Sequence, residues 1–182
     1  MITNEILAAT YGEENIVTMP FKRARQIGLS PLDSRMLAFV GLPRESPPIF
    51  TTRTQDGPDS LSVHGFKTDG EDNKILILGA PADDNRRRFC LDVRDEFIVL
   101  ILFKANESWA EIVNSSLDSF VEFIYRIQEF RDQIGKEPAE SRQTVESLRS
   151  YLRDLDPPAL EESDSWWSVA LDRLSAGEGT SK

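Results

Sequence analysis

Residues 113–130 read VNSSLDSFVEFIYRIQEF, and this stretch decides the fold class. The polar residues 114–116 are of the types that begin helices, and Ser115 with Asp118 has the spacing of a capping box. Apolar residues then recur at helical spacing, namely Leu117, Phe120, Val121, Ile124 and Ile127. The stretch therefore predicts that a strand ends near Val113 and that the last third of the chain is helical.

Short apolar runs separated by polar turns precede this point and predict strands. The runs are Ile49–Thr54, Leu61–Phe66, Lys74–Leu78, Arg88–Asp92, Phe97–Phe103 and Glu111–Val113. Connections this short leave no room for crossover helices, so we expect the strands to pair antiparallel.

Helical patterns lie on both sides of the strand region. Before it, we expect a helix over residues 4–11 capped by Thr3, a short strand over 15–19, and a helix beginning at Ser30-Pro31. The second helix is expected to bury one face, made of Leu32, Met36, Leu37 and Val40. After the strands, further helices are expected from Pro138 and over 165–174, separated by a break at 156–158.

The order helices, strands, helices predicts an α+β fold. In it, a central antiparallel sheet has N-terminal helices and a C-terminal helical segment packed against it. A chain of 182 residues suits one core. We therefore expect one domain over residues 1–175, followed by a disordered tail over 176–182.

The composition is that of an acidic protein without a membrane segment. Its formal net charge is -10, and no apolar run approaches the roughly 20 residues that span a bilayer. Residues 1–10 contain no Lys or Arg, unlike the start of a secretory signal, and a lone Cys90 excludes an internal disulfide. We expect a cytoplasmic protein that binds neither membrane nor nucleic acid, since its charge repels phosphates.

Residues able to carry catalysis are few. His64 and Cys90 are the single histidine and cysteine, too few for a zinc site, and Cys90 lies in a strand pattern typical of a buried thiol. The acidic turns match no calcium loop, and no glycine-rich phosphate motif is present. The sequence therefore predicts no catalytic, metal or cofactor site.

Two local features have alternative interpretations. The run Arg86–Arg88 follows Asp83 and Asp84 closely in the sequence. This proximity favours a mixed-charge turn over a phosphate-binding site. Trp166 and Trp167 point about 100° apart on a helix, so one is expected in the core and the other at its edge. An aromatic anchor for a partner is the alternative interpretation of this pair.

Several short motifs occur in a recognisable order. They are Gly41-Leu42-Pro43, Phe89-Cys90-Leu91-Asp92, Val113-Asn114-Ser115-Ser116-Leu117, Asp156-Pro157-Pro158-Ala159-Leu160 and Trp166-Trp167. Over residues 30–175 this order resembles the fourth subfamily of the SUKH immunity proteins. Members often have a glycine turn after the Cys-Leu-Asp triplet. Here residues 93–96 contain none, so the shape of that loop is left open.

The resemblance implies a protein that binds and neutralises a cognate toxin and has no catalysis of its own. Toxins of such systems are often nucleases or nucleic-acid deaminases, whose substrate sites are basic. We expect an acidic face of this protein to cover the toxin's active site. The expected partner-binding residues are Asp69, Glu71, Asp72, Asp83 and Asp84.

Other functions stay open at this stage. The same fold occurs in regulators of cell-wall synthesis, so a regulatory or scaffold protein with a cellular partner is the alternative. An enzyme is the least favoured reading. The identity of the toxin and the oligomeric state do not follow from the sequence.

Overall fold

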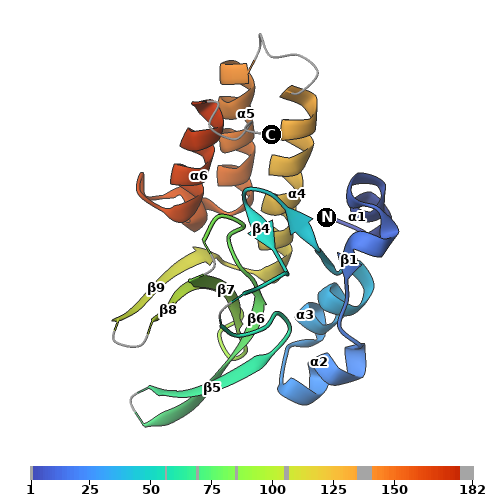
Figure 1. Ribbon diagram of the computed structural model, residues 1–182, viewed down its shortest axis with the longest axis vertical. Coiled ribbons are helices and arrows are strands. Elements are labelled where there is room, and N and C mark those ends of the chain that lie inside the picture. Colours follow the sequence, from blue (N-terminus) through green and yellow to red (C-terminus); the bar gives the residue numbers. More distant parts are fainter. Residues whose placement is uncertain are drawn as a thin grey trace.

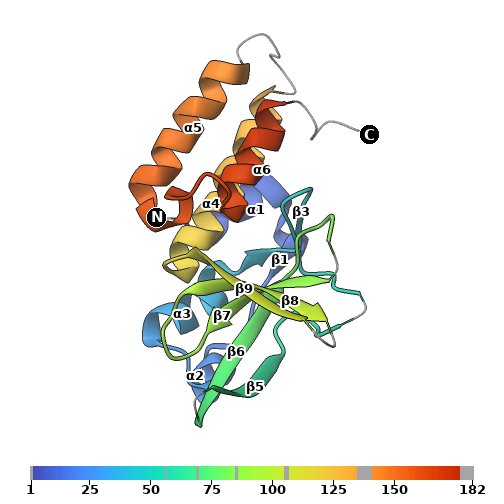
Figure 2. The same cartoon turned by 90° about the vertical axis from the view of Figure 1, so that its left-hand side faces the viewer.

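The computed structural model describes residues 2–55, 57–68, 70–84, 86–104, 107–134 and 141–176. Three C-terminal helices, α4 (Leu117–Ile134), α5 (Ser141–Leu155) and α6 (Trp166–Ser175), gather at one end of the molecule (Figures 1 and 2). Two N-terminal helices, α2 (Phe21–Ile27) and α3 (Pro31–Arg35), lie beside the sheet. This arrangement confirms the predicted α+β class. The predicted tail over 176–182 lies, from residue 177 on, outside the described residues.

The central sheet has five antiparallel strands in the order β5-β6-β7-β8-β9. Their bounds are β5 (Val63–Thr68), β6 (Glu71–Gly79), β7 (Arg87–Asp92), β8 (Ile98–Lys104) and β9 (Glu107–Asn114). Two small antiparallel pairs complete the strands: β1 (Ile16–Val17) with β2 (Leu42–Pro43), and β3 (Glu45–Ser46) with β4 (Phe50–Thr51). Each strand follows its neighbour without a crossover, as the short connections predict.

The two faces of the sheet have different surroundings. Successive residues alternate between faces, so Leu76 and Phe89 enter the main core while Ile77 and Cys90 belong to a smaller cluster on the opposite face. The main core extends along the chain from Ile2 to Leu171. Helices therefore cover one face of the sheet, and the other is left partly open.

The N-terminal segment contains a helix that the sequence does not predict. Helix α1 (Asn4–Tyr11) begins and ends as expected, with Thr3 accepting a hydrogen bond from the backbone of Ile6. A short helix η1 (Glu13–Asn15) follows, and then α2 (Phe21–Ile27). Only Ala24 of α2 is buried, so this helix has no apolar stripe to reveal it.

The helix predicted from Ser30 is present but turns differently. It begins as α3 (Pro31–Arg35) with Ser30 as its cap, and continues as a π-helix, η2 (Met36–Val40). Met36 and Leu37 are buried as predicted, but Leu32 is 65% exposed. The predicted buried face is therefore wrong at this residue, because α3 turns Asp33 and Ser34 to the interior in its place.

The C-terminal helices are α4 (Leu117–Ile134), α5 (Ser141–Leu155) and α6 (Trp166–Ser175), with a short helix η4 (Pro157–Leu160) between the last two. The predicted capping box is wrong by one residue. The hydroxyl of Ser116, and not that of Ser115, accepts the backbone N–H of Ser119, at 3.1 Å. The predicted helix start at Pro138 lies outside the described residues.

A buried carboxylate explains why Ser115 is engaged elsewhere. Asp156, only 2% exposed, accepts hydrogen bonds from the Ser115 and Ser119 hydroxyls, both at 2.7 Å, and from the Asn114 amide at 3.0 Å. Asn114 in turn accepts the indole N–H of Trp167 at 2.8 Å. We call these five residues the Asp156 network, and it joins β9, α4, α6 and the segment before η4.

The loop without glycine, residues 93–96, keeps a tight turn by other means. One carboxylate oxygen of Asp92 accepts the backbone N–H groups of Arg94 and Asp95, at 2.8 and 2.9 Å. Glu96 then adopts the left-handed region, with φ of 62°. An aspartate turn and a strained glutamate thus replace the glycine of the family pattern.

Candidate partner-binding groove

The acidic residues expected to bind a partner fall in two separate places. Glu71 and Asp72 lie at the start of β6, where Glu71 pairs with Arg94 and Asp72 lies 3.5 Å from Lys67. Asp83 and Asp84 follow the other end of β6, roughly 25 Å away along a strand of this length. The structure therefore does not bring the two acidic loops together, and Asp69 lies outside the described residues.

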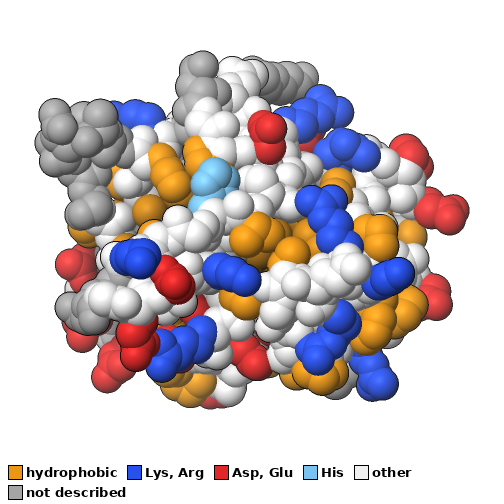
Figure 3. Space-filling model, turned by 90° about the horizontal axis from the view of Figure 1, so that it is seen from below, with side chains coloured by type: hydrophobic (Ala, Val, Ile, Leu, Met, Phe, Trp, Pro, Cys, Tyr) orange, Lys and Arg blue, Asp and Glu red, His pale blue; other side chains and the backbone are white. Residues whose placement is uncertain are grey.

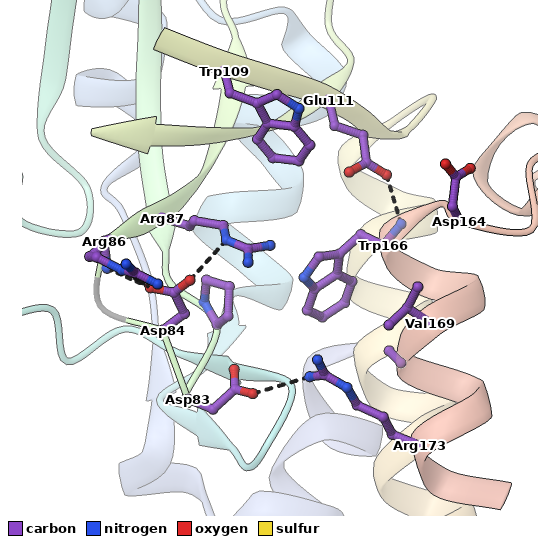
Figure 4. A pocket seen from close by; sticks show the side chains of 12 residues that line it. Asp83, Asp84, Arg86, Arg87, Trp109, Glu111, Asp164, Trp166, Val169 and Arg173 are labelled. Atoms are coloured by element: carbon purple, nitrogen blue, oxygen red, sulfur yellow. Dashed lines mark hydrogen bonds and ion pairs between the residues drawn. The ribbon is translucent and has the colours of Figure 1, made fainter. Parts of the chain in front are cut away.

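Asp83 and Asp84 line a groove between the sheet and α6 (Figure 4). The groove has a volume of about 380 Å³. Its lining comes from the β6–β7 loop, from β7 and β9, and from α6 with the segment before it. Besides Asp83 and Asp84, the lining residues are Pro81, Arg86, Arg87, Trp109, Glu111, Asp164, Trp166, Val169, Ala170 and Arg173. We call it the sheet–α6 groove.

Ion pairs hold one wall of this groove. Arg86 and Arg87 both pair with Asp84, at 3.2 and 2.9 Å, and Arg173 of α6 lies 3.3 Å from Asp83. Burial would raise the pKa of Asp84, but hydrogen bonds from Arg86 and the two arginine charges hold that pKa below its ordinary value. The run Arg86–Arg88 thus forms the predicted mixed-charge turn at its first two positions.

The third arginine of the run has a structural role. Arg88 is fully buried and donates to the backbone carbonyls of Gln55 and Pro58, at 2.8 and 3.0 Å. It fixes the segment that precedes β5 against the sheet.

The start of α6 places Glu111 at the upper end of the groove. Ser165 caps the helix by accepting the backbone N–H of Ser168 at 3.3 Å. The N–H of Trp166 in the first turn has no partner within the helix, and Glu111 of β9 accepts it at 2.7 Å. The carboxylate of Glu111 is therefore held at a helix N-terminus, where negative charge is favoured.

The two adjacent tryptophans differ in burial as predicted. Trp167 is fully buried, while Trp166 is half-buried, lines the groove, and packs edge-on against Phe89 at 5.0 Å between ring centroids. Sequence reasoning missed Trp109, whose side chain is 44% exposed and whose ring lies 5.8 Å from the guanidinium of Arg87. It lies just before the predicted strand Glu111–Val113, and the true strand begins four residues earlier.

The upper rim of the groove carries carboxylates without a positive partner. No Lys or Arg within the described ranges forms an ion pair with Glu111 or Asp164, which both line the groove. Burial raises the pKa of Glu111; the Trp166 N–H opposes this shift and the charge of Asp164 adds to it. Sequence reasoning also missed these two residues, because each is an ordinary surface acid until the fold places it.

The net charge is unevenly distributed over the molecule. Residues 107–175 contain 15 acidic and 7 basic residues, whereas residues 16–54 contain 2 acidic and 6 basic ones. Figure 3 shows the face opposite the helical end, where Lys and Arg lie across the middle among hydrophobic side chains. The excess of negative charge therefore belongs to the part of the chain that includes α6 and the groove rim.

Cys90 and His64 have separate contacts. Cys90 is fully buried, and this burial raises the pKa of its thiol. His64 lies on β5, 3.1 Å from the Ser62 hydroxyl and edge-on to Phe103. Among the described residues no group of three or more His, Cys, Asp or Glu has an arrangement that would hold a metal ion.

The remaining findings concern the whole chain. No helix in the described part of the chain is long and apolar enough to cross a membrane. A search of curated proteins and a search of solved structures each found no match. The family model described as SUKH-4 immunity protein matches residues 2–173, which is nearly the full length. The chain therefore belongs to the SUKH-4 immunity protein family.

Proposed function

We propose that this protein neutralises a cognate toxin domain in the cytosol by binding it through the sheet–α6 groove and its acidic rim. The observation that carries the proposal is the combination of an exposed indole, Trp109, with the carboxylates of Glu111 and Asp164, which form no ion pair among the described residues. Tryptophan is enriched among residues that dominate binding energy, and unpaired charge gives specificity and fast association. Neutralisation needs no chemistry from this chain, so we propose binding alone.

The mechanism follows from the charge of the expected target. A nuclease or nucleic-acid deaminase binds polyanions, so its substrate cleft is basic. The acidic rim attracts such a cleft and orients it, and Trp109 then anchors the contact. Once docked, the immunity protein occupies the place of the substrate and excludes it.

The two acidic loops expected from the sequence contribute differently in this proposal. Asp83 and Asp84 form the wall of the groove, where their ion pairs hold Arg86, Arg87 and Arg173 in place. Glu71 and Asp72 lie at the other end of β6, and their own partners offset part of their charge. We therefore assign the groove the larger share of the binding energy and the β5–β6 hairpin a smaller one.

A co-expression rescue tests the proposal. The toxin domain encoded nearest to this gene is induced in bacteria with and without the protein, and the two are then co-purified. Rescue of growth together with a stable complex supports immunity by direct binding. Growth arrest in both cultures, with no complex, contradicts it and favours a regulatory or scaffold protein that binds a cellular partner.

A further inference from the structure

The charges inside the groove are unequally matched. The three arginines of its lining, Arg86, Arg87 and Arg173, each pair with Asp83 or Asp84. Glu111 and Asp164 have no such ion pair among the described residues, although the charge of Arg87 acts weakly on Glu111. An anion entering the groove would have to displace Asp83 or Asp84 from its arginine partner. A cation, in contrast, can bind Glu111 and Asp164 without breaking an ion pair.

The backbone places an aromatic ring next to these carboxylates. Trp109 and Glu111 are two residues apart on β9, so their side chains leave the same face of the sheet roughly 7 Å apart. Asp164 lies just before α6 and is close enough to raise the pKa of Glu111. Figure 4 shows Trp109, Glu111 and Trp166 around the upper part of the groove.

Resting on the proposed immunity function, we propose that the groove receives one arginine side chain of the toxin, with its guanidinium held by Glu111 and Asp164 against the Trp109 indole. A guanidinium is planar, donates several hydrogen bonds in a fixed geometry and stacks on aromatic rings. Arg87 already lies 5.8 Å from the centre of the Trp109 ring, so this indole accepts a guanidinium in the free protein.

One oxygen of Glu111 is already engaged by the backbone of Trp166 at 2.7 Å. The second oxygen has no hydrogen-bond partner among the described residues and is available to the incoming side chain. Substitution with glutamine keeps an oxygen for the Trp166 N–H and removes the charge. Glu111→Gln therefore separates the role in capping α6 from the role in binding a cation.

The three tryptophans of the chain provide the experiment. In a ¹⁵N-labelled protein each indole N–H gives its own signal, and the buried Trp167 N–H, bound to Asn114, serves as an internal control. The protein is titrated with N-acetyl-arginine amide and, in parallel, with N-acetyl-citrulline amide, which has the same shape without the charge. The double variant Glu111→Gln/Asp164→Asn and the control Glu13→Gln, an exposed residue of η1, are titrated in the same way.

The expected result is a saturable shift of the Trp109 signal with the arginine compound, in the millimolar range for so small a ligand. Trp167 stays unmoved, citrulline has no effect, Glu13→Gln behaves as the original protein, and the double variant loses most of the shift. Equal shifts with arginine and citrulline, or a full shift in the double variant, would overturn the inference.

The titration requires no toxin, so its result is independent of the rescue experiment. Rescue without an arginine-specific shift removes the arginine site and leaves the immunity function. An arginine-specific shift without rescue supports the site and removes the immunity function.

Discussion

The Asp156 network and the sheet–α6 groove share two elements, β9 and α6, yet they differ in the burial and pairing of their polar groups. β9 supplies Asn114 to the network and Glu111 to the groove, and α6 supplies Trp167 to the one and Trp166 to the other. In the network, every polar group is hydrogen-bonded, and all the residues except the exposed Ser115 are buried. In the groove, aromatic rings are exposed, and carboxylates at the rim have no positive partner among the described residues.

The difference separates structural residues from candidate binding residues. Buried polar groups that are fully satisfied hold elements in one arrangement, whereas exposed and unpaired groups leave binding energy for a partner. The motifs that carry the family resemblance, residues 113–117, 156–160 and 166–167, meet in the Asp156 network. They therefore identify the fold, and the residues proposed to bind the toxin lie beside them.

The largest expected effect is on stability, from Asp156→Ala. It leaves the buried donors of Asn114 and Ser119 unsatisfied and removes the partner of the exposed Ser115, so we expect a loss of about 3 kcal/mol in the free energy of unfolding. Urea denaturation followed by tryptophan fluorescence measures it. A loss below about 1 kcal/mol would mean that the network does not hold these elements together.

The adjacent tryptophans provide the second test. Trp167→Phe removes a buried hydrogen bond and volume, and we expect it to cost about 2 kcal/mol of stability. Trp166→Phe is expected to cost less than about 1 kcal/mol, because its ring is half-buried. Thermal denaturation of the two variants compares them, and equal losses would contradict the division of roles.

Charge reversal compares the groove rim with the β5–β6 hairpin. Asp164→Lys is expected to slow association with the toxin several-fold at low salt and to reduce its salt dependence. Glu71→Lys/Asp72→Lys is expected to have a smaller effect, because Arg94 and Lys67 already offset these charges. Stopped-flow measurement of the association rate at several salt concentrations compares the two variants. A larger effect of the hairpin variant would contradict the groove as the interface and assign it to the hairpin.

The pH dependence of Glu111 is the smallest expected effect. Because its pKa is raised in the folded protein, its protonated form contributes stability at low pH that is lost as the pH rises through the folded pKa. Toxin binding has the opposite sign, since it needs the ionised form. The affinity ratio of the original protein to Glu111→Gln should be several-fold at about pH 7 and approach one near pH 4. A constant ratio would contradict a role for this charge.

Most of the architecture was predictable because it depends on local pattern. The alternation and spacing of apolar residues identified the five strands of the sheet, and the division of Trp166 and Trp167 followed from helix geometry. Helix α2 was not predictable, since it buries only Ala24. The groove was not predictable either, because Trp109 and Arg173 are far apart in sequence and meet only when α6 packs beside β9.

The most direct test of the groove as the toxin-binding surface compares two exposed residues of the same strand. Trp109, 44% exposed, faces the groove, while Ile112, 59% exposed, lies on the opposite face of the sheet. Calorimetric titration of the cognate toxin into Trp109→Ala and Ile112→Ala measures both affinities. The account predicts a loss of at least about tenfold for Trp109→Ala and nearly full affinity for Ile112→Ala. Full affinity for Trp109→Ala with a loss for Ile112→Ala would contradict it and place the toxin on the open face of the sheet.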